Sequence, residues 1–351
     1  MSSRALSVFA PAVFVIAALP GAPAFAAPAV SDGAILDVTP TTSKLTARDR
    51  HQEFFTVSFQ AEAGETRYVA TNLVVQDAKG TSPNELYVGV TLSCTSPSRA
   101  VSSAGTGRNV WPSAPDFAIP VGFVLNTDVA GTYECQADVM LCEPGNCEAP
   151  SGKGVLSIVT QRMDPKQYSL LYVSTALPAW ADAVEVPAKK DLLIKPSASQ
   201  TLTNTFDVGA TLPEAVRIGA LLSVTNCIEK SYPDSCAKAG KTAIQGSATM
   251  SLSLTLTQVA TQPGVTCAKT RATAKTGART TRITWQQHHA VESIYVPAFD
   301  LDDDPGCSTQ VKASLTVKVG KGNAVVIEPG TKGKARSVLY VIPGDAAPAA
   351  S

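Results

Sequence analysis

The chain carries the same set of landmarks twice, in the same order. The stretch over residues 35–173 is matched by the stretch over residues 192–341, and loop insertions account for the differences in spacing. The matched positions are Cys94 with Cys267, Trp111 with Trp285, Phe123 with Phe299, Cys135 with Cys307, and residues 169–173 with 337–341. Because each stretch is long enough to be a domain, we expect two copies of one domain, related by internal duplication.

The first 26 residues have the features of a signal peptide. Arg4 precedes an apolar run over residues 8–19 and the small-residue pattern Ala24-Phe25-Ala26. We expect cleavage after Ala26 and a secreted protein, either extracellular or periplasmic. The apolar run is too short to span a bilayer, so we expect no transmembrane segment in the mature chain.

The composition favours strands. The chain has 29 basic and 29 acidic residues, and loss of Arg4 leaves a net charge of about −1. This balance does not attract nucleic acid, and we expect no nucleic-acid partner. Charged residues make up 17% of the chain, while Thr, Ser, Val and Ala are abundant. Small and β-branched side chains suit pleated strands, which predicts an all-β fold.

The predicted organisation follows from the repeat and from Pro-rich segments. It comprises a signal peptide over residues 1–26, an Ala/Pro-rich lead over 27–34, a first domain over 35–175, a linker over 176–190, a second domain over 191–343 and a disordered tail over 344–351. Apolar and polar residues alternate over 250–257 and 311–319, which predicts strands with one buried face. The same parity predicts that Cys135 and Cys307 point into the core and that Cys142 points outward.

All eight cysteines lie in the expected mature chain, which favours disulfides over redox or metal chemistry. The repeat predicts that Cys94 pairs with Cys135 and Cys267 with Cys307, each within its own domain. The remaining predicted pairs are Cys142 with Cys147 and Cys227 with Cys236. Each bridge within the repeat closes a loop of roughly 40 residues and stabilises its domain by about 4 kcal/mol in the chain-entropy model. We expect loss of one such bridge to destabilise one domain and leave the other folded.

Residues 128–135, Asp-Val-Ala-Gly-Thr-Tyr-Glu-Cys, resemble the segment before the second Cys of immunoglobulin-like domains. The resemblance implies that the Tyr133 hydroxyl bonds back to the chain upstream, and that the disulfide joins two sheets beside a buried Trp. Trp111 and Trp285 are the matching tryptophans, whereas Pro305 stands at the Tyr position of the second copy. The chain thus resembles bacterial exported proteins with tandem immunoglobulin-like or fibronectin-like β-sandwich domains, a class that implies no particular activity.

An acidic run before Cys307 is a candidate calcium site. It contains Asp300, Asp302, Asp303 and Asp304. Closely spaced Asp residues supply several of the six to eight oxygen ligands that Ca²⁺ takes. The run lacks the spacing of an EF-hand, and a solvated turn is the alternative. We expect no other cofactor, since the CxxC spacing of zinc sites is absent.

Two further features are candidate contact sites. A stretch without acidic residues holds Lys269, Arg271, Lys275, Arg279 and Arg282. It either meets an anionic wall polymer or lipopolysaccharide or forms a basic loop without a ligand. Trp180, in the predicted linker, either stacks on a sugar ring or packs the two domains together.

The sequence contains neither a GxSxG nor an HExxH motif. His288 and His289 are adjacent and would point to opposite faces of a strand, and oxidised cysteines exclude thiol catalysis. We therefore predict a protein that is not an enzyme: an exported binding or adhesion module whose partner is a protein or glycan at the cell surface. A hydrolase without a recognisable motif and a structural spacer are the alternatives.

Overall fold

The computed structural model describes the strands and most of their connections. The described residues are 29–30, 44–46, 52–76, 86–110, 117–142, 155–158, 169–209, 215–228, 234–240, 246–265, 267, 271–275, 281–284, 288–331 and 334–344. The predicted signal peptide, Cys147, Trp111, Trp285, Lys269 and Arg279 lie outside this set.

The first half of the chain forms a sandwich of two sheets. Its strands are β1 (Ala29–Val30), β2 (Lys44–Thr46), β3 (Gln52–Ala61), β4 (Thr66–Gln76), β5 (Leu86–Thr95), β6 (Val101–Val110), β7 (Phe117–Asn126), β8 (Gly131–Cys142), β9 (Val155–Ile158) and β10 (Leu170–Val173). Sheet A has the order β1-β3-β8-β5-β6. In sheet B, β4 pairs with β7 along one side and with β10 and β9 along the other, and β2 lies beyond β9.

The second half repeats this arrangement. Its elements are β11 (Asp182–Glu185), β12 (Leu192–Ile194), β13 (Ser199–Asp207), β14 (Ala215–Asn226), the 3₁₀ helix η2 (Asp234–Ala239), β15 (Ala248–Ala260), β16 (Arg271–Lys275), β17 (Thr281–Ile283), β18 (His289–Asp300), β19 (Cys307–Gly322), β20 (Val325–Ile327), β21 (Gly330–Thr331), β22 (Lys334–Ala335) and β23 (Val338–Pro343). In sheet D, β14 pairs with β18 on one side and with β23 and β20 on the other. Sheet E has the order β13-β19-β15, followed by β16 and β17. Strand β11 lies within the predicted linker and pairs with β23.

The strand order of each half is that of a jelly roll. Strands are counted from β2 in the first half and from β12 in the second, without β21 and β22. Three pairs of neighbouring segments each count as one strand: β9 with β10, β16 with β17, and β20 with β23. Each half then has a sheet of order 2-7-4-5 and a sheet of order 1-8-3-6. The jelly roll is an eight-stranded pair of sheets made of two Greek keys. The predicted all-β fold with two tandem, disulfide-bonded sandwiches is confirmed. The order differs from the four-plus-three strand division of the immunoglobulin sandwich.

Alternation of apolar and polar residues accounts for the two cores. Met250, Leu252, Leu254 and Leu256 are buried, as predicted, whereas the Ser and Thr residues between them are half-buried or exposed. Strand β19 follows the same pattern from Val311 to Val319. Each sandwich therefore encloses its own cluster of buried side chains.

Three of the four predicted disulfides are present: Cys94–Cys135, Cys227–Cys236 and Cys267–Cys307. Cys142 is also disulfide-bonded, but its predicted partner, Cys147, lies outside the described residues. The first bridge does not join two sheets, as the resemblance implied. Cys94 and Cys135 face each other on neighbouring strands of sheet A, with a Cα–Cα distance of 4.0 Å. The bridge thus staples one sheet, because the jelly-roll order makes β5 and β8 neighbours. Cys267 bonds to Cys307 at the start of β19, and a third bridge joins Cys227 to Cys236.

Two predicted side-chain directions concern Cys142 and Cys307. Cys142 shares the outward parity of Met140 and is nevertheless buried. It pairs with Tyr87 on β5, whose ring contacts His289 of the second sandwich. Cys307 is half-buried because it is the first residue of β19, at the rim of the core.

The tyrosine contact implied by the resemblance is present. The Tyr133 hydroxyl donates to the Val129 carbonyl oxygen at 2.9 Å and lies 2.8 Å from a carboxylate oxygen of Asp128. The ring is buried and stacks on Phe59 at 5.8 Å between centroids. Tyr133 thus fixes the turn that leads into β8.

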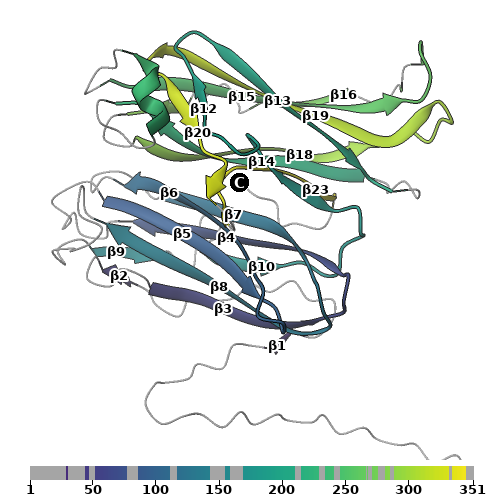
Figure 1. Cartoon of the computed structure of the whole chain (residues 1–351), viewed down its shortest axis with the longest axis horizontal. Helices are drawn as coiled ribbons and strands as arrows, with labels where there is room; N and C mark the ends of the chain where they lie inside the picture. Colours follow the sequence, from purple (N-terminus) through teal and green to yellow (C-terminus); the bar gives the residue numbers. More distant parts are fainter. Residues whose placement is uncertain are drawn as a thin grey trace, which may run out of the picture.

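The second sandwich lies across the edge of the first that β6 and β7 form (Figure 1). Sheet D faces the first sandwich, and sheet E lies on the far side. Strand β22 pairs in parallel with β6, through Ala335 and Ala104, so a segment of the second half extends sheet A. We call the contact of sheet D and β22 with β4, β6, β7 and β10 the junction.

Candidate functional site

The junction has an aromatic centre. The rings of Tyr68 on β4 and Tyr340 on β23 stack at 5.5 Å between centroids, and Tyr172 lies 6.3 Å from Tyr68. All three are buried together with Leu177 and Ile342. Burial, which disfavours the phenolate, raises the pKa of Tyr68 and raises that of Tyr340 to about 12. These hydroxyls therefore stay protonated at neutral pH.

A polar network lies beside the aromatic centre. The carboxylate of Glu328 is buried and binds both the Arg336 guanidinium and the Thr225 hydroxyl, the latter at 2.6 Å. The Thr225 hydroxyl is also 2.8 Å from Nδ1 of His289, whose backbone amide donates to Oδ1 of Asn109 on β6 at 2.6 Å. The network thus runs from the interior of the second sandwich to the first.

His289 is held neutral by this environment. Burial, followed by the neighbouring His288 and Arg336 side chains, lowers its pKa from 6.5 to about 3. Its ring also contacts Tyr87 of the first sandwich at 5.5 Å between centroids. A general base works best when its pKa lies near the operating pH. His289 therefore has the properties of a packing residue at the junction and not those of a proton shuttle.

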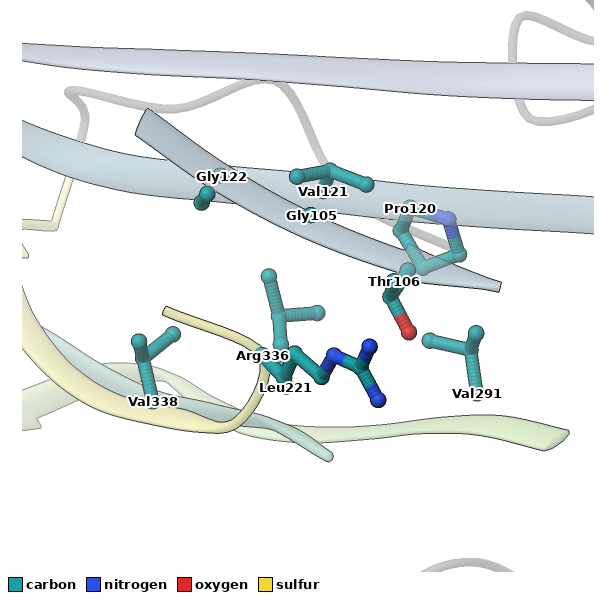
Figure 2. Close-up of a pocket in the computed structure, with 10 residues that line it drawn as sticks. Gly105, Thr106, Pro120, Val121, Gly122, Leu221, Val291, Arg336 and Val338 are labelled. Atoms are coloured by element: carbon teal, nitrogen blue, oxygen red, sulfur yellow. The ribbon is translucent and has the colours of Figure 1, made fainter. Parts of the chain in front are cut away.

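A small cavity lies within the junction (Figure 2). Its lining includes Thr106, Val121, Leu221, Val291 and Arg336, which come from both sandwiches. The volume is about 10 Å³, room for about one water molecule and far below the roughly 300–1,000 Å³ that is usual for small-molecule sites. Apolar side chains and glycine dominate the lining, and the Arg336 guanidinium is bound by Glu328. The cavity is thus a packing gap between the sandwiches.

Sheet E presents a different surface on the side away from the junction. Its outward side chains form four rows across β13, β19 and β15, which we call the hydroxyl face. The rows are Ser199–Lys318–Ser251, Thr201–Thr316–Ser253, Thr203–Ser314–Thr255 and Thr205–Lys312–Thr257. These side chains are half-buried or exposed, whereas the residues that alternate with them in β15 and β19 are buried.

The hydroxyl face is uniform in chemistry because strand parity and register combine. Period-two alternation puts every second side chain of β15 and β19 on the outward side, and the antiparallel register aligns hydroxyls across three strands. The Thr201 and Thr316 hydroxyls lie 3.0 Å apart, which is a cross-strand hydrogen bond of the kind that stabilises sheets. The sequence predicted the alternation, but not which strands lie side by side.

The acidic run forms a tight loop between β18 and β19. Asp300, Asp303 and Asp304 are exposed, and Asp302 is half-buried. A carboxylate oxygen of Asp302 accepts from the amide of Asp304, and one of Asp304 accepts from the amide of Gly306. Within the described part of the chain, no three His, Cys, Asp or Glu side chains converge on a possible metal position. The calcium site stays a prediction.

Only part of the predicted basic stretch can be placed. Arg271 and Lys275 begin and end β16, where the backbone register pairs them with Thr257 and Ser253 of the hydroxyl face. Arg282 on β17 is exposed and donates to the Ser247 hydroxyl at 3.2 Å. Two residues of this stretch thus lie on the strand that borders the hydroxyl face.

Trp180 packs between the sandwiches. Its half-buried ring contacts the core of the second sandwich and the aromatic centre of the junction. Gly209 lies directly beneath it, because a Cβ at that position would come within 3.1 Å of the indole Cδ1. This position matches the packing alternative for Trp180; binding of a sugar stays a prediction.

One Ser-x-x-Lys sequence, from Ser235 to Lys238, lies in η2. The Ser235 hydroxyl donates to a carboxylate oxygen of Asp191 at 2.8 Å, and Lys238 is exposed. An activated nucleophile needs an adjacent base with a lowered pKa, for which a lysine is desolvated. An exposed Lys238 does not meet this requirement.

Comparisons with known proteins give no family. No family model matches the chain, and no curated protein matches its sequence. The chain is weakly similar to a chain of Sulfolobus turreted icosahedral virus, at 9% identity and a TM-score of 0.24, covering 89% of this chain and 61% of that one. The chain is also weakly similar to the CBM22-1–CBM22-2 tandem domain of Paenibacillus barcinonensis Xyn10C, at 8% identity and a TM-score of 0.25. This match covers 85% of this chain and 99% of that one.

A third similar structure is PNGase F, a glycosylasparaginase from Flavobacterium meningosepticum, at 11% identity and a TM-score of 0.23, with 90% and 98% covered. Scores this low carry no information about the site or the activity. In the described part of the chain, no helix is both long and apolar enough to span a membrane.

Proposed function

We propose that the protein is an exported, non-catalytic binding or adhesion module that meets its partner through the hydroxyl face. The observation that carries this proposal is the contrast between the two faces of the second sandwich. Sheet D is covered by the junction, whereas the outward side chains of sheet E are polar, half-buried or exposed, and aligned in rows. A rigid sheet holds these groups in place before a partner arrives, which lowers the entropy cost of binding.

The proposal of a non-catalytic role rests on the buried titratable groups. His289 and Glu328 are engaged in contacts that join the sandwiches, and the cavity beside them is small. Active sites place titratable groups with suitable pKa values around a space for the substrate. The contacts of the junction and the small size of the cavity favour a scaffold role for this region over that of a hydrolase active site.

Export is proposed from the cysteines. Three disulfides join described residues, and none of the cysteines in the described part of the chain is a thiol. Disulfides persist in oxidising compartments such as the periplasm and the extracellular space. This supports a location outside the cytoplasm, where the partner is a protein or glycan of the cell surface.

Co-sedimentation tests the proposed function. Purified mature protein is mixed with the producing organism's cells and with isolated wall material, and the pelleted fraction is measured against protein concentration. We expect saturable pelleting that Ser314→Tyr, at the centre of the hydroxyl face, reduces by more than about half. The matched control is Ser58→Tyr, an outward position on β3 opposite Glu134, which should pellet like the unaltered protein.

Two results would contradict the proposal. Equal pelleting of both variants would place the contact surface elsewhere. The protein would be a hydrolase if it released soluble fragments from the wall material. The amount released would then increase with time, and the rate of release would increase with protein concentration.

A further inference from the structure

We infer that the ligand of the hydroxyl face is an extended anionic polysaccharide, carrying carboxylate or phosphate groups along its chain. The inference rests on the proposed function and adds the chemistry of the ligand. It is drawn from the position of two lysines, from the charge of the surrounding face and from the side chains between them.

The two lysines set the length of the ligand. Lys312 and Lys318 lie on β19, both exposed and both on the outward side. They are six positions apart along the strand, which is about 20 Å at the rise of a β-strand. A monosaccharide or a single phosphate cannot reach both ammonium groups, whereas an extended polymer lying along β19 contacts both.

The groups between the lysines suit a sugar chain. Two complete rows, Thr201–Thr316–Ser253 and Thr203–Ser314–Thr255, fill this interval. Each hydroxyl both donates and accepts hydrogen bonds, as do the hydroxyls of a polysaccharide. A polymer lying along β19 would thus meet a lysine at each end of this interval and two rows of hydroxyls between the lysines. The lysines offer charge contacts, and the hydroxyls offer hydrogen bonds.

The charge of the face selects an anion. The outward residues of the four rows include two lysines and no acid. Asp207 follows at the end of β13, where its carboxylate accepts from the Thr309 hydroxyl at 2.8 Å. The corresponding strand of the first sandwich, β8, has the opposite character, since Glu134 and Asp138 occupy outward positions there. An anionic polymer is therefore attracted to sheet E and repelled from sheet A.

The same side chains disfavour other occupants. Protein interfaces are enriched in aromatic residues at their centre and depleted in Lys and Ser, and the four rows contain no aromatic residue. Neutral sugars bind through aromatic platforms in many proteins, and the face has none to offer. Lysine is a binder of carboxylate and phosphate groups, which leaves an anionic glycan as the occupant that fits best.

The test measures binding of the mature protein to three defined polymers by affinity electrophoresis. The probes are polygalacturonate, poly(glycerol phosphate) and neutral dextran, of similar length. We expect retardation by one or both anionic polymers and not by dextran, and the better of the two identifies the anionic group. Added salt should weaken the binding, because screening acts on exposed charges.

Charge reversal on the face provides the matched comparison. The double variant Lys312→Glu/Lys318→Glu should bind the anionic polymer about tenfold more weakly or worse. The control Lys190→Glu/Lys195→Glu changes the net charge equally at two exposed lysines outside the face and should change affinity less than about twofold. Unchanged thermal unfolding of both variants excludes a folding defect.

The possible failures are distinguishable. If the protein pellets with wall material but binds dextran as well as the anionic polymers, or if both double variants bind alike, the anionic inference is wrong and the proposed function stands. If Lys312→Glu/Lys318→Glu abolishes a salt-sensitive self-association, the occupant is a second copy of the chain. Absence of both pelleting and retardation would overturn the inference and the proposed function together.

Discussion

At the scale of single residues, the junction depends on a few buried polar groups. Glu328 joins Arg336, Thr225 and, through Thr225, His289. A buried carboxylate with these partners cannot be removed without leaving a guanidinium and a hydroxyl short of an acceptor. The contact with Thr225 carries no signal in the sequence, because the two residues are 103 positions apart.

Glu328→Ala should destabilise the protein by roughly 2–3 kcal/mol. The reason is loss of the acceptor for Arg336 and Thr225 at a position that is 3% exposed. Urea unfolding at neutral pH measures the change. Glu134→Ala removes an exposed carboxylate on β8 and should stay within about 0.5 kcal/mol. Equal effects of the two substitutions would refute the importance assigned to the network.

His289 predicts a dependence of stability on pH. Its pKa is about 3 in the folded protein and 6.5 in the unfolded reference. Between these values the unfolded state binds more protons, so stability falls as the pH drops below about 6.5, by up to about 3 kcal/mol at pH 4. Replacement by Gln removes this contribution. Chemical unfolding at pH 7 and pH 4 should show a smaller loss for His289→Gln than for the unaltered protein, and an equal loss would contradict the assignment.

At the scale of elements, the alternation of apolar and polar residues specifies the strands, and the backbone geometry of the turns specifies where the strands end. The period-two pattern over residues 250–257 predicted both the strand and its buried face, and Cys135 is buried as its parity requires. The burial of Cys142 did not follow from the pattern, because parity distinguishes the two faces of a strand but not what covers them. The hydroxyl face was not predicted, since it needs the neighbours of β15 and not only its own sequence.

Gly322 tests the turn that ends β19. Its φ is +117°, and a Cβ would lie 2.0 Å from the Ser247 carbonyl oxygen. Gly322→Ala should therefore destabilise the protein by more than about 2 kcal/mol, as strain and a backbone clash combine. Gly264→Ala is the control, since its φ is +86° but no atom lies within 4 Å of the added Cβ. It should cost only about 1 kcal/mol in the same thermal unfolding experiment. A larger loss of stability for Gly264→Ala than for Gly322→Ala would show that the backbone around Ser247 moves to accommodate the added Cβ.

At the scale of the whole molecule, the two sandwiches form one body. The sequence predicts the two halves, and independent unfolding was expected from the location of each disulfide. The structure adds a buried aromatic centre, a shared strand pair between β22 and β6, and Val291 of β18 in the core of the first sandwich. None of these contacts follows from either half alone, so the junction lay beyond prediction. The domain limits and the internal duplication stay predictions, although both halves share one strand order.

Replacement of both Cys94 and Cys135 by Ala should now unfold the two sandwiches together. Loss of the bridge costs about 2–4 kcal/mol, and the junction transmits this cost because its buried surface exists only when both partners are folded. Differential scanning calorimetry should show one transition at a lower temperature. With Tyr340→Ala added, which removes a ring from the junction, two transitions should separate. Two transitions without that substitution would show that the junction does not couple the sandwiches.

We propose that the hydroxyl face is the surface that meets the partner. Lysine acetylation followed by mass spectrometry, with and without isolated wall material, tests it directly. We expect Lys312 and Lys318 to become protected on binding, while the exposed Lys190 and Lys195 stay as reactive as before. Unchanged reactivity of Lys312 and Lys318 in bound protein would contradict the claim and move the contact surface to another part of the molecule.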